Sequence, residues 1–393
     1  MKKIMIIGAG ILQVPAIIKA KELGLHVIAL DMNPEAPGFK ISDESIQLST
    51  NDIQNAVKVA EEIKPDAVIT IASDMPIRTV AAIGERCGLV TISPETALKA
   101  TDKGEMRKTL MSHNIPIPRF YVISSLEEYK LVTNNFSGDY IVKPADNSGS
   151  RGIYLVNKMD KSDDAFRHAK AHSRSGSILV EEYMMGPEVS VETLTVDDET
   201  HVISITDKLT TGAPHFTEMG HSIPSQLPDK VINEIKNLAI SAIKAIGINV
   251  GPSHTEIIIT EDGPKIVELG ARLGGDNITT HLVPLATGID MVECTIRLAL
   301  GEKIEIFQKY QMGAAIRYFN APEGILKSIE YLTVTEDIEG VEEIRITKGI
   351  GESVTKIRSS TDRVGYIISR ATSPREAVAL CEEVASSIKF IVT

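Results

Sequence analysis

The feature that most constrains the fold is a glycine- and serine-rich segment between two short apolar runs. Residues 140–142 form the first run, which ends at Lys143, and residues 153–156 form the second. We interpret both runs as β-strands because they are short, apolar and bounded by turn-forming residues. Residues 146–152 between them are small, polar or glycine, with one arginine. Their backbone N–H groups can approach an anion closely. Lys143 adds a point charge that suits a phosphate. The alternative is an ordinary flexible hairpin loop.

Two glutamates downstream, Glu256 and Glu268, favour the anion-binding interpretation. Residues 253–260 and 264–269 read as two strands around a turn at residues 261–263, which are Glu-Asp-Gly. A three-residue loop with glycine last is a common hairpin closure. That register places Glu256 opposite Glu268 on one sheet face, with Cβ atoms about 5 Å apart.

Two carboxylates at that separation repel each other unless a cation lies between them. Mg²⁺ that also binds nucleotide phosphates needs few such ligands, and Mn²⁺ accepts the same oxygen donors. A register slipped by one residue, which would leave a solvated face, is the alternative. Taken together, the loop and the carboxylate pair predict a site for ATP and Mg²⁺.

The composition sets broad limits on partners. The chain has 393 residues, 43% of them hydrophobic and 24% charged, enough for two or three soluble domains. A formal net charge of −12 offers no electrostatic case for nucleic acid or an anionic membrane. The three cysteines, Cys87, Cys294 and Cys381, lack metal-ligand spacing, which suits a reducing cytoplasm. No apolar stretch reaches membrane-spanning length, and Gly8 interrupts the N-terminal run. We expect a cytoplasmic homodimer that binds small molecules and neither nucleic acid nor membrane.

The chain opens with a strand–turn–helix–strand pattern over residues 3–30, in which Gly8 and Gly10 form the turn. Such a start suggests a dinucleotide cofactor. The fingerprint is incomplete, however, because Gln13 occupies the third glycine position. Asp31 could hold a ribose or simply end the second strand. We therefore favour a sheet that does not bind a dinucleotide.

Helices and strands continue to alternate, with helices over residues 53–63 and 76–87. Ser93 is a candidate N-cap, and Asp102-Lys103 opens a further helix. A proline-punctuated connector follows, where we place the first domain boundary. The predicted fold is α/β in four parts: a Rossmann-like domain (1–112), a small β-rich lid (113–190), a core (191–305) and a C-terminal α+β module (306–393).

Three later segments carry further polar groups. Glu188, Ser190 and Glu192 alternate with valines, which predicts a strand with one acidic face and one core face. Residues 207–228 lack periodicity, so we predict a long loop there. Three residues of that loop could meet a substrate or simply face solvent: His215, Glu218 and His221. Residues 270–277 form a second glycine-rich turn with one arginine. Ser373 predicts a capping box for the last helix.

In this order and spacing, these motifs resemble the ATP-grasp superfamily, in particular its carboxylate–amine ligases. The Gly-Ala-Arg-Leu-Gly-Gly-Asp run is most similar to the branch that contains bacterial L-amino acid ligases. The resemblance implies that Lys103 and Lys143 contact ATP phosphates, and that Arg272 steadies the transferred phosphate or an acyl-phosphate. It implies that Glu256 and Glu268 hold Mg²⁺ and that Glu188 accepts from the ribose. The remaining implied contacts are the phosphate lid and the adenine hinge: Ser148, Gly149, Ser150, Arg151 and Gly152, then Glu181, Glu182, Tyr183 and Met184.

One departure from the family pattern concerns Gly270. Many members have an asparagine two residues after the second metal glutamate, so a third protein ligand to the metal is in doubt here.

Four functions compete. The leading one is an ADP-forming ligase that activates a carboxylate, expected to be an amino acid, and couples it to an amine. A second keeps the fold and uses bicarbonate or a nucleotide-pathway intermediate. A third is a non-catalytic ATP-binding regulator, against which the retained lysines, glutamates and Arg272 argue. The fourth is a nicotinamide oxidoreductase, against which Gln13 argues. The identity of the two substrates stays open.

Overall fold

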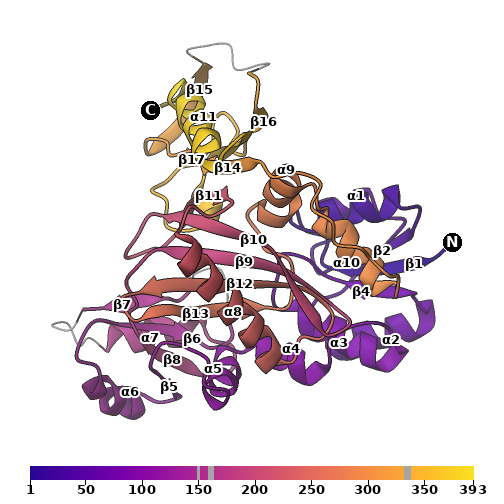
Figure 1. Ribbon diagram of the computed structural model, residues 1–393, viewed down its shortest axis with the longest axis horizontal. Coiled ribbons are helices and arrows are strands. Elements are labelled where there is room, and N and C mark those ends of the chain that lie inside the picture. Colours follow the sequence, from indigo (N-terminus) through magenta and orange to yellow (C-terminus); the bar gives the residue numbers. More distant parts are fainter. Residues whose placement is uncertain (148–150, 158–162, 332–337) are drawn as a thin grey trace.

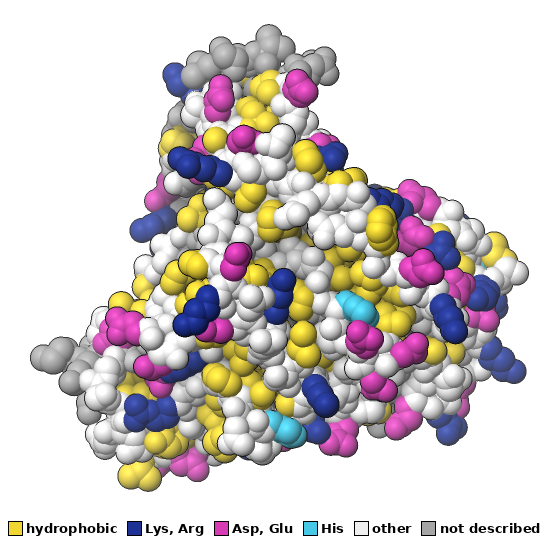
Figure 2. Space-filling view, viewed as in Figure 1, with side chains coloured by type: hydrophobic (Ala, Val, Ile, Leu, Met, Phe, Trp, Pro, Cys, Tyr) yellow, Lys and Arg dark blue, Asp and Glu magenta, His cyan; other side chains and the backbone are white. Residues whose placement is uncertain are grey.

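The computed structural model describes residues 1–147, 151–157, 163–331 and 338–393. Four β-sheets organise these residues, with the N-terminal sheet at the right of Figure 1 and the C-terminal residues at its top. None of the helices in the described part is long and apolar enough to cross a membrane. On the face drawn in Figure 2, acidic and basic side chains are interspersed rather than gathered by sign.

The N-terminal sheet is parallel, with strand order β3-β2-β1-β4. Its strands are β1 (Lys3–Ile7), β2 (His26–Asp31), β3 (Glu44–Gln47) and β4 (Ala67–Ile69). The accompanying helices are α1 (Val14–Glu22), η1 (Pro37–Lys40), α2 (Ile53–Ile63) and α3 (Pro76–Cys87). Strand β1 has a continuous run of fully buried side chains from Ile4 to Ile7, as expected of a parallel strand covered on both faces. The predicted strand–helix–strand start is confirmed.

The turn after β1 is filled by protein groups rather than shaped for a pyrophosphate. The side-chain amide of Gln13 donates to the Ile71 carbonyl at 2.8 Å, and a Cβ on Gly8 would lie 3.2 Å from Gln13. Asp31 accepts from the N–H of Ala9 at 2.8 Å, so its carboxylate holds the turn. Helix α1 accordingly begins at Val14, later than the glycine turn predicted. These contacts argue against dinucleotide binding.

Two short helices lead out of this sheet, α4 (Pro94–Thr101) and α5 (Lys103–Ser112). As predicted, the side chain of Ser93 caps α4 by accepting from the N–H of Thr96. Asp102 caps α5 in the same way. Lys103 is therefore fixed as the first residue of a capped helix.

The next sheet has the order β5-β8-β6-β7. It consists of β5 (Phe120–Ile123), β6 (Tyr140–Pro144), β7 (Tyr154–Val156) and β8 (Ile178–Glu182), with α6 (Leu126–Val132), η2 (Thr133–Asn135) and α7 (Asp164–His172) beside it. Tyr129, Tyr140 and Phe166 form part of its aromatic core. The two strands predicted around the glycine-rich segment are β6 and β7, which pair antiparallel.

The largest sheet has eight strands in the order β13-β12-β9-β10-β11-β14-β18-β16. Its first five strands are β9 (Glu188–Val196), β10 (Glu199–Thr210), β11 (Glu218–Ile223), β12 (Gly251–Thr260) and β13 (Gly263–Gly270). Helix α8 (Asp229–Ile246) packs on the apolar face, where Val189 and Val191 lie with Ile235 and Ile243. The alternation predicted for β9 is confirmed, and its polar face is turned away from α8.

The prediction of a long loop over residues 207–228 is wrong for two parts of that range. Residues 207–210 complete β10 and residues 218–223 form β11, whereas 211–217 and 224–228 lie outside helices and strands. Lys208 pairs with His221 in an antiparallel register. Charged and hydroxyl side chains line one face of both strands. Polar residues also follow one another directly, at Asp207-Lys208 and His221-Ser222. They interrupt the alternation of apolar and polar residues by which a half-buried strand is recognised.

The remaining strands belong to the C-terminal residues. Strands β14 (Gly313–Tyr318), β16 (Val341–Ile346) and β18 (Gly365–Ala371) extend the large sheet across the expected boundary at residue 306. A small sheet contains β15 (Gly324–Tyr331), β17 (Ser353–Val354) and β19 (Ile388–Val392). The helical segments after β13 are η3 (Ile278–Leu282), α9 (Val283–Thr287), α10 (Met291–Ala299), η4 (Ser360–Asp362) and α11 (Pro374–Ser386). Ser373 caps α11 by accepting from the N–H of Glu376.

The turn between β8 and β9 generates a prediction at Gly186. Its φ is +149°, and a Cβ there would lie 1.9 Å from the carbonyl oxygen of Ile259. We expect Gly186→Ala to lower the free energy of unfolding by about 1–3 kcal/mol, because the backbone of β12 cannot move away cheaply. Gly138→Ala is the control, since a Cβ at that position meets nothing within 4 Å. Urea unfolding of both variants checks this, and equal stabilities would contradict it.

Candidate active site

A cavity of about 440 Å³ lies between the β6–β8 sheet and the polar face of the large sheet. Most of the residues predicted to bind nucleotide or metal line it: Lys103, Lys143, Arg151, Glu181, Glu182, Tyr183, Met184, Glu188, Glu256, Glu268 and Arg272. Ser148, Gly149 and Ser150 lie outside the described residues. Gly152 packs away from the cavity, where a Cβ would lie 2.6 Å from His172.

The hairpin of β12 and β13 brings Glu256 opposite Glu268, as predicted, although the turn differs from the one expected. Thr260 pairs with Gly263 across a two-residue loop, and the register shifts by one residue beyond Ile257. Val267 is the extra residue of this bulge, and its carbonyl accepts from Arg107 at 2.7 Å. The bulge compensates for the shorter turn, so the two carboxylates still face each other.

Each of the two glutamates is paired with a lysine. Glu268 lies 2.6 Å from the Lys103 ammonium, and Glu256 lies 2.9 Å from that of Lys208. Burial would raise the pKa of Glu256, but Lys208 and His254 hold it well below its usual range. Glu256 therefore stays ionised, as a ligand of a divalent cation must be.

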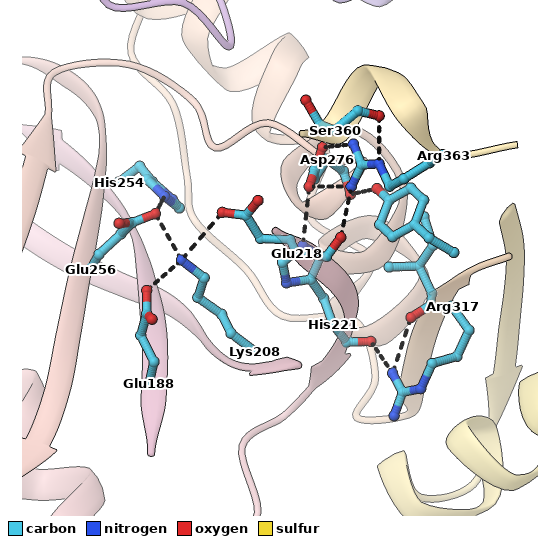
Figure 3. Close-up of polar contacts among 12 residues, drawn as sticks. Glu188, Lys208, Glu218, His221, His254, Glu256, Asp276, Arg317, Ser360 and Arg363 are labelled. Atoms are coloured by element: carbon cyan, nitrogen blue, oxygen red, sulfur yellow. Dashed lines mark hydrogen bonds and ion pairs between the residues drawn. The ribbon is translucent and has the colours of Figure 1, made fainter. Parts of the chain in front are cut away.

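Lys208 was missed by sequence reasoning because it lies in the segment interpreted as a loop. Its side chain is 4% exposed and lies 2.5 Å from Glu188, 2.9 Å from Glu256 and 3.7 Å from Glu218 (Figure 3). Burial would lower its pKa, but these three carboxylates raise it well above the usual value. One ammonium cannot neutralise all three, and the pKa of Glu188 is raised by burial and by Glu256 despite Lys208. Lys208 follows Asp207, which pairs with Val189 of β9, and this register brings its ammonium to Glu188.

A buried ion triad lies under the β6–β8 side of the cavity. The Glu181 carboxylate is 2.5 Å from Arg107 and 2.5 Å from Lys143. Burial would raise the pKa of Glu181, yet the two cations lower it to about 2. Lys143 shares the Glu181 carboxylate with Arg107 as its counter-charge. Burial, with the nearby charges of Arg107 and Lys103, lowers the pKa of Lys143. An anion such as a phosphate would complete its neutralisation.

The expected adenine hinge is anchored on both sides. The N–H of Glu182 donates to the backbone carbonyl of Arg119, and that of Tyr183 donates to the backbone carbonyl of Asp139. The Glu182 carboxylate lies 2.9 Å from Lys265. These bonds hold the segment that leads to Met184 at the cavity wall.

Arg272 is oriented by Asp74, at the loop that follows β4. The two are 2.7 Å apart, and both are largely buried. A Cβ at residue 270 would lie 2.8 Å from the Asp74 carboxylate. The ion pair thus occupies the space that a side chain at Gly270 would need, which explains why this chain has no asparagine there. Asp74 and Arg272 are 198 residues apart, so no local sequence pattern links them.

His254 forms a second buried pair beside Glu256. Its Nδ1 lies 2.7 Å from Glu192. Burial would lower the pKa of His254, but Glu192 and Glu256 raise it to about 9. Of the three loop residues left open, Glu218 and His221 line the cavity, whereas His215 is absent from its described lining.

The balance of charge on the wall indicates how a polyanion could bind. Eight carboxylates face the cavity: Asp74, Glu181, Glu182, Glu188, Glu218, Glu256, Glu268 and Asp276. Five lysine and arginine side chains face it: Lys103, Lys143, Arg151, Lys208 and Arg272. A nucleotide triphosphate needs further positive charge in such a site, and the facing carboxyl groups of Glu256 and Glu268 fit a divalent cation. The described residues contain no cluster of three or more potential metal ligands, so phosphates or water would complete the coordination.

Three family models match the chain in order. The ribonucleotide synthetase preATP-grasp domain matches residues 1–100, the ATP-grasp domain matches 136–280, and the L-amino acid ligase C-terminal domain 2 matches 317–393. Residues 136–280 thus match an ATP-grasp domain, and the predicted α/β fold with ATP-grasp architecture is confirmed.

Individual proteins similar to this chain are ligases. The crystal structure of an L-amino acid ligase from Bacillus licheniformis has a TM-score of 0.87 and 22% identity, with 100% of this chain and 99% of that chain covered. The phosphoribosylamine–glycine ligase of Methanococcus vannielii is 26% identical, covering 90% of this chain and 87% of its own. The L-arginine-specific L-amino acid ligase of Bacillus subtilis is 24% identical, covering 76% and 74%. The chain is an ATP-grasp ligase of the carboxylate–amine class that resembles the L-amino acid ligases.

The buried triad generates a stability prediction with a defined pH dependence. Glu181→Gln should lower the free energy of unfolding at pH 7 by about 3–5 kcal/mol, because Arg107 and Lys143 lose their counter-charge. The pKa of Glu181 falls on folding from 4.5 to about 2. Its stabilisation is therefore present above pH 4.5 and is lost as the pH falls towards 2.

Urea unfolding of wild type and variant across this range provides the measurement. The difference between them should shrink as the pH falls below 4.5, and a difference independent of pH would contradict the assignment. Glu105→Gln is the matched control, because Glu105 pairs with Lys108 at the surface. Its effect should stay within about 1 kcal/mol.

Proposed function

We propose that this protein is an ADP-forming ligase that activates a carboxylate as an acyl-phosphate and couples it to an amine. The observation that carries the proposal is one cavity in which Lys103, Lys143 and Arg272 converge with the paired Glu256 and Glu268. Those groups suit the terminal phosphates of ATP, where charge develops during phosphoryl transfer.

The nucleotide would lie between the Glu182–Met184 hinge and the two lysines. In that arrangement Lys103 and Lys143 contact phosphates, and Glu188 accepts from the ribose hydroxyls. Lys208 would also lie beside the nucleotide, since its ammonium lies between Glu188 and Glu256. Mg²⁺ held by Glu256 and Glu268 would supply the positive charge that offsets the phosphates.

The reaction has two steps. A carboxylate oxygen of the first substrate attacks the γ-phosphorus of ATP, the bond to the β–γ bridging oxygen breaks, and ADP leaves. The amine nitrogen then attacks the acyl carbon, the carbon–oxygen bond to the phosphoryl group breaks, and phosphate leaves as the nitrogen loses a proton. Arg272, held by Asp74, is placed to steady the transferred phosphoryl group. Because an acyl-phosphate hydrolyses in water, a closing cover is required, and residues 148–152 are our candidate.

An amino acid is the proposed carboxylate substrate. Glu218 adds a carboxylate to the wall beside Lys208, and such a group suits an ammonium ion. The similarity to an L-arginine-specific L-amino acid ligase and to an L-amino acid ligase structure supports the same class.

A second candidate is coupling of an amino acid to an amine of a nucleotide pathway. It is favoured by the similarity to a phosphoribosylamine–glycine ligase, which extends over 90% of this chain. Both candidates use the same activation step. Phosphate release from ATP and Mg²⁺, measured across amino acids singly, in pairs and with phosphoribosylamine, separates them.

The reaction order can be tested directly. With ATP, Mg²⁺ and the correct carboxylate but no amine, hydroxylamine should trap an acyl-phosphate as a hydroxamate. Addition of the amine should release ADP and phosphate in equal amounts. AMP as the product would mean attack at the α-phosphorus and would contradict the proposal. Tight ATP binding without turnover would favour a non-catalytic regulator.

The metal assignment makes its own prediction. Glu268→Gln should reduce turnover by roughly a hundredfold or more while the protein stays folded, because the cation loses a charged ligand. The control is Glu261→Gln, at the exposed turn of the same hairpin, which should turn over normally. Wild-type kcat in Glu268→Gln at ordinary Mg²⁺ concentration would show that the metal assignment is wrong.

A further inference from the structure

The segment after Arg272 has an unusual backbone. Asp276 and Asn277 have φ values of +51° and +63°, so two consecutive residues with side chains are left-handed. Aspartate and asparagine tolerate this region better than most residues, but rarely in succession. Gly275, Asp276 and Ile278 all line the cavity. This left-handed backbone therefore requires contacts that hold residues 275–278 in place.

The restraint comes from the C-terminal residues. Arg363 donates to both carboxylate oxygens of Asp276, at 2.8 and 2.9 Å, in a bidentate pair. Tyr318 donates from its hydroxyl to the Asp276 carbonyl at 3.1 Å. The Arg363 guanidinium lies 3.6 Å above the Tyr318 ring. Side chain and backbone of Asp276 are thus both held, as Figure 3 shows for Arg363.

The same guanidinium holds two further pieces of the wall. One Nη of Arg363 donates to the backbone carbonyl of Glu218 in β11 at 3.2 Å. Its Nε donates to the carbonyl of Ser360 at 2.9 Å. Glu218 and Ser360 both line the cavity. We call the part of the lining formed by Glu218, His221, Gly275, Asp276 and Ser360 the substrate wall.

We propose that Arg363 is a positioning residue that sets the geometry of the substrate wall, so that the C-terminal module controls how the carboxylate or amine substrate binds. This rests on the proposed function in one respect: the hinge and the two lysines are assigned to ATP, which leaves this wall to the other substrates. Arg363 is not itself part of the described lining, and it acts through Asp276, Glu218 and Ser360.

The arrangement predicts a selective effect. Arg272 lies four residues before Asp276 but is held separately by Asp74. Loss of the Arg363 contacts therefore frees the substrate wall without releasing the phosphate-binding groups. The KM of a substrate that binds there should rise, while the KM of ATP should hardly change.

The test compares Arg363→Lys, Arg363→Gln and Tyr318→Phe with Arg358→Lys, an exposed arginine of the same module. Lysine keeps the charge but cannot form the bidentate contact, so the KM of the carboxylate or amine should rise in the order wild type, lysine, glutamine. We expect a rise of roughly tenfold or more in Arg363→Gln, with the KM of ATP within about twofold of wild type. Tyr318→Phe should show a smaller rise, and Arg358→Lys none. Unchanged KM values, or an equal rise in the KM of ATP, would overturn the proposal.

Hydrogen exchange gives a readout that needs no turnover. Amides of residues 274–278 should exchange faster in Arg363→Lys and Tyr318→Phe, with residues 251–270 unchanged. If the wild-type enzyme forms no amide with any substrate pair, the proposed function fails, while exchange still tests the restraint. Exchange at 274–278 that matches wild type in both variants would refute the role of Arg363, and so would a general loss of protection across the protein.

Discussion

The cavity depends on ion pairs that join side chains from distant parts of the chain. Asp74 from the N-terminal sheet holds Arg272, Lys103 from α5 meets Glu268, and Arg363 from the C-terminal residues holds Asp276. Glu181 lies between two buried cations in the same way. A buried charge that loses its partner is strongly destabilising. The same ion pairs therefore fix both the relative placement of the sheets and the geometry of the cavity.

Many of these pairs use the groups that the proposed reaction assigns to ligands. Lys103 pairs with Glu268 and Lys208 pairs with Glu256, so each glutamate has a lysine as its counter-charge. Binding of a metal and phosphates would exchange these partners: glutamates would turn to the cation and lysines to the phosphates. Much of the desolvation of these charges is thus completed when the chain folds. A site whose charges are already buried and aimed needs little reorganisation during the reaction.

Local patterns predicted much of the nucleotide side of the site. The strands flanking the glycine-rich segment, the helix opened by Lys103 and the facing pair Glu256–Glu268 were all found from short-range signals. The last succeeded although the turn was misread, because the bulge at Val267 restored the register. The loop predicted over residues 207–228 failed for a physical reason. Consecutive polar residues, Asp207-Lys208 in β10 and His221-Ser222 in β11, interrupted the alternation that marks a strand, and Lys208 was missed as a result.

The substrate wall could not be predicted for a different reason. Arg363 and Asp276 are 87 residues apart, and Asp74 and Arg272 are 198 apart. Neither pair can be recognised from local periodicity, because each partner, considered alone, is an ordinary charged residue near a turn. Phosphate binding uses glycine loops and strand-end lysines that carry their own sequence signals. In the proposed reaction, the other substrates would meet side chains assembled from β11, the turn after β13 and the C-terminal module. This difference explains why the class of reaction follows from motifs, whereas the choice of substrate depends on contacts that only the folded chain creates.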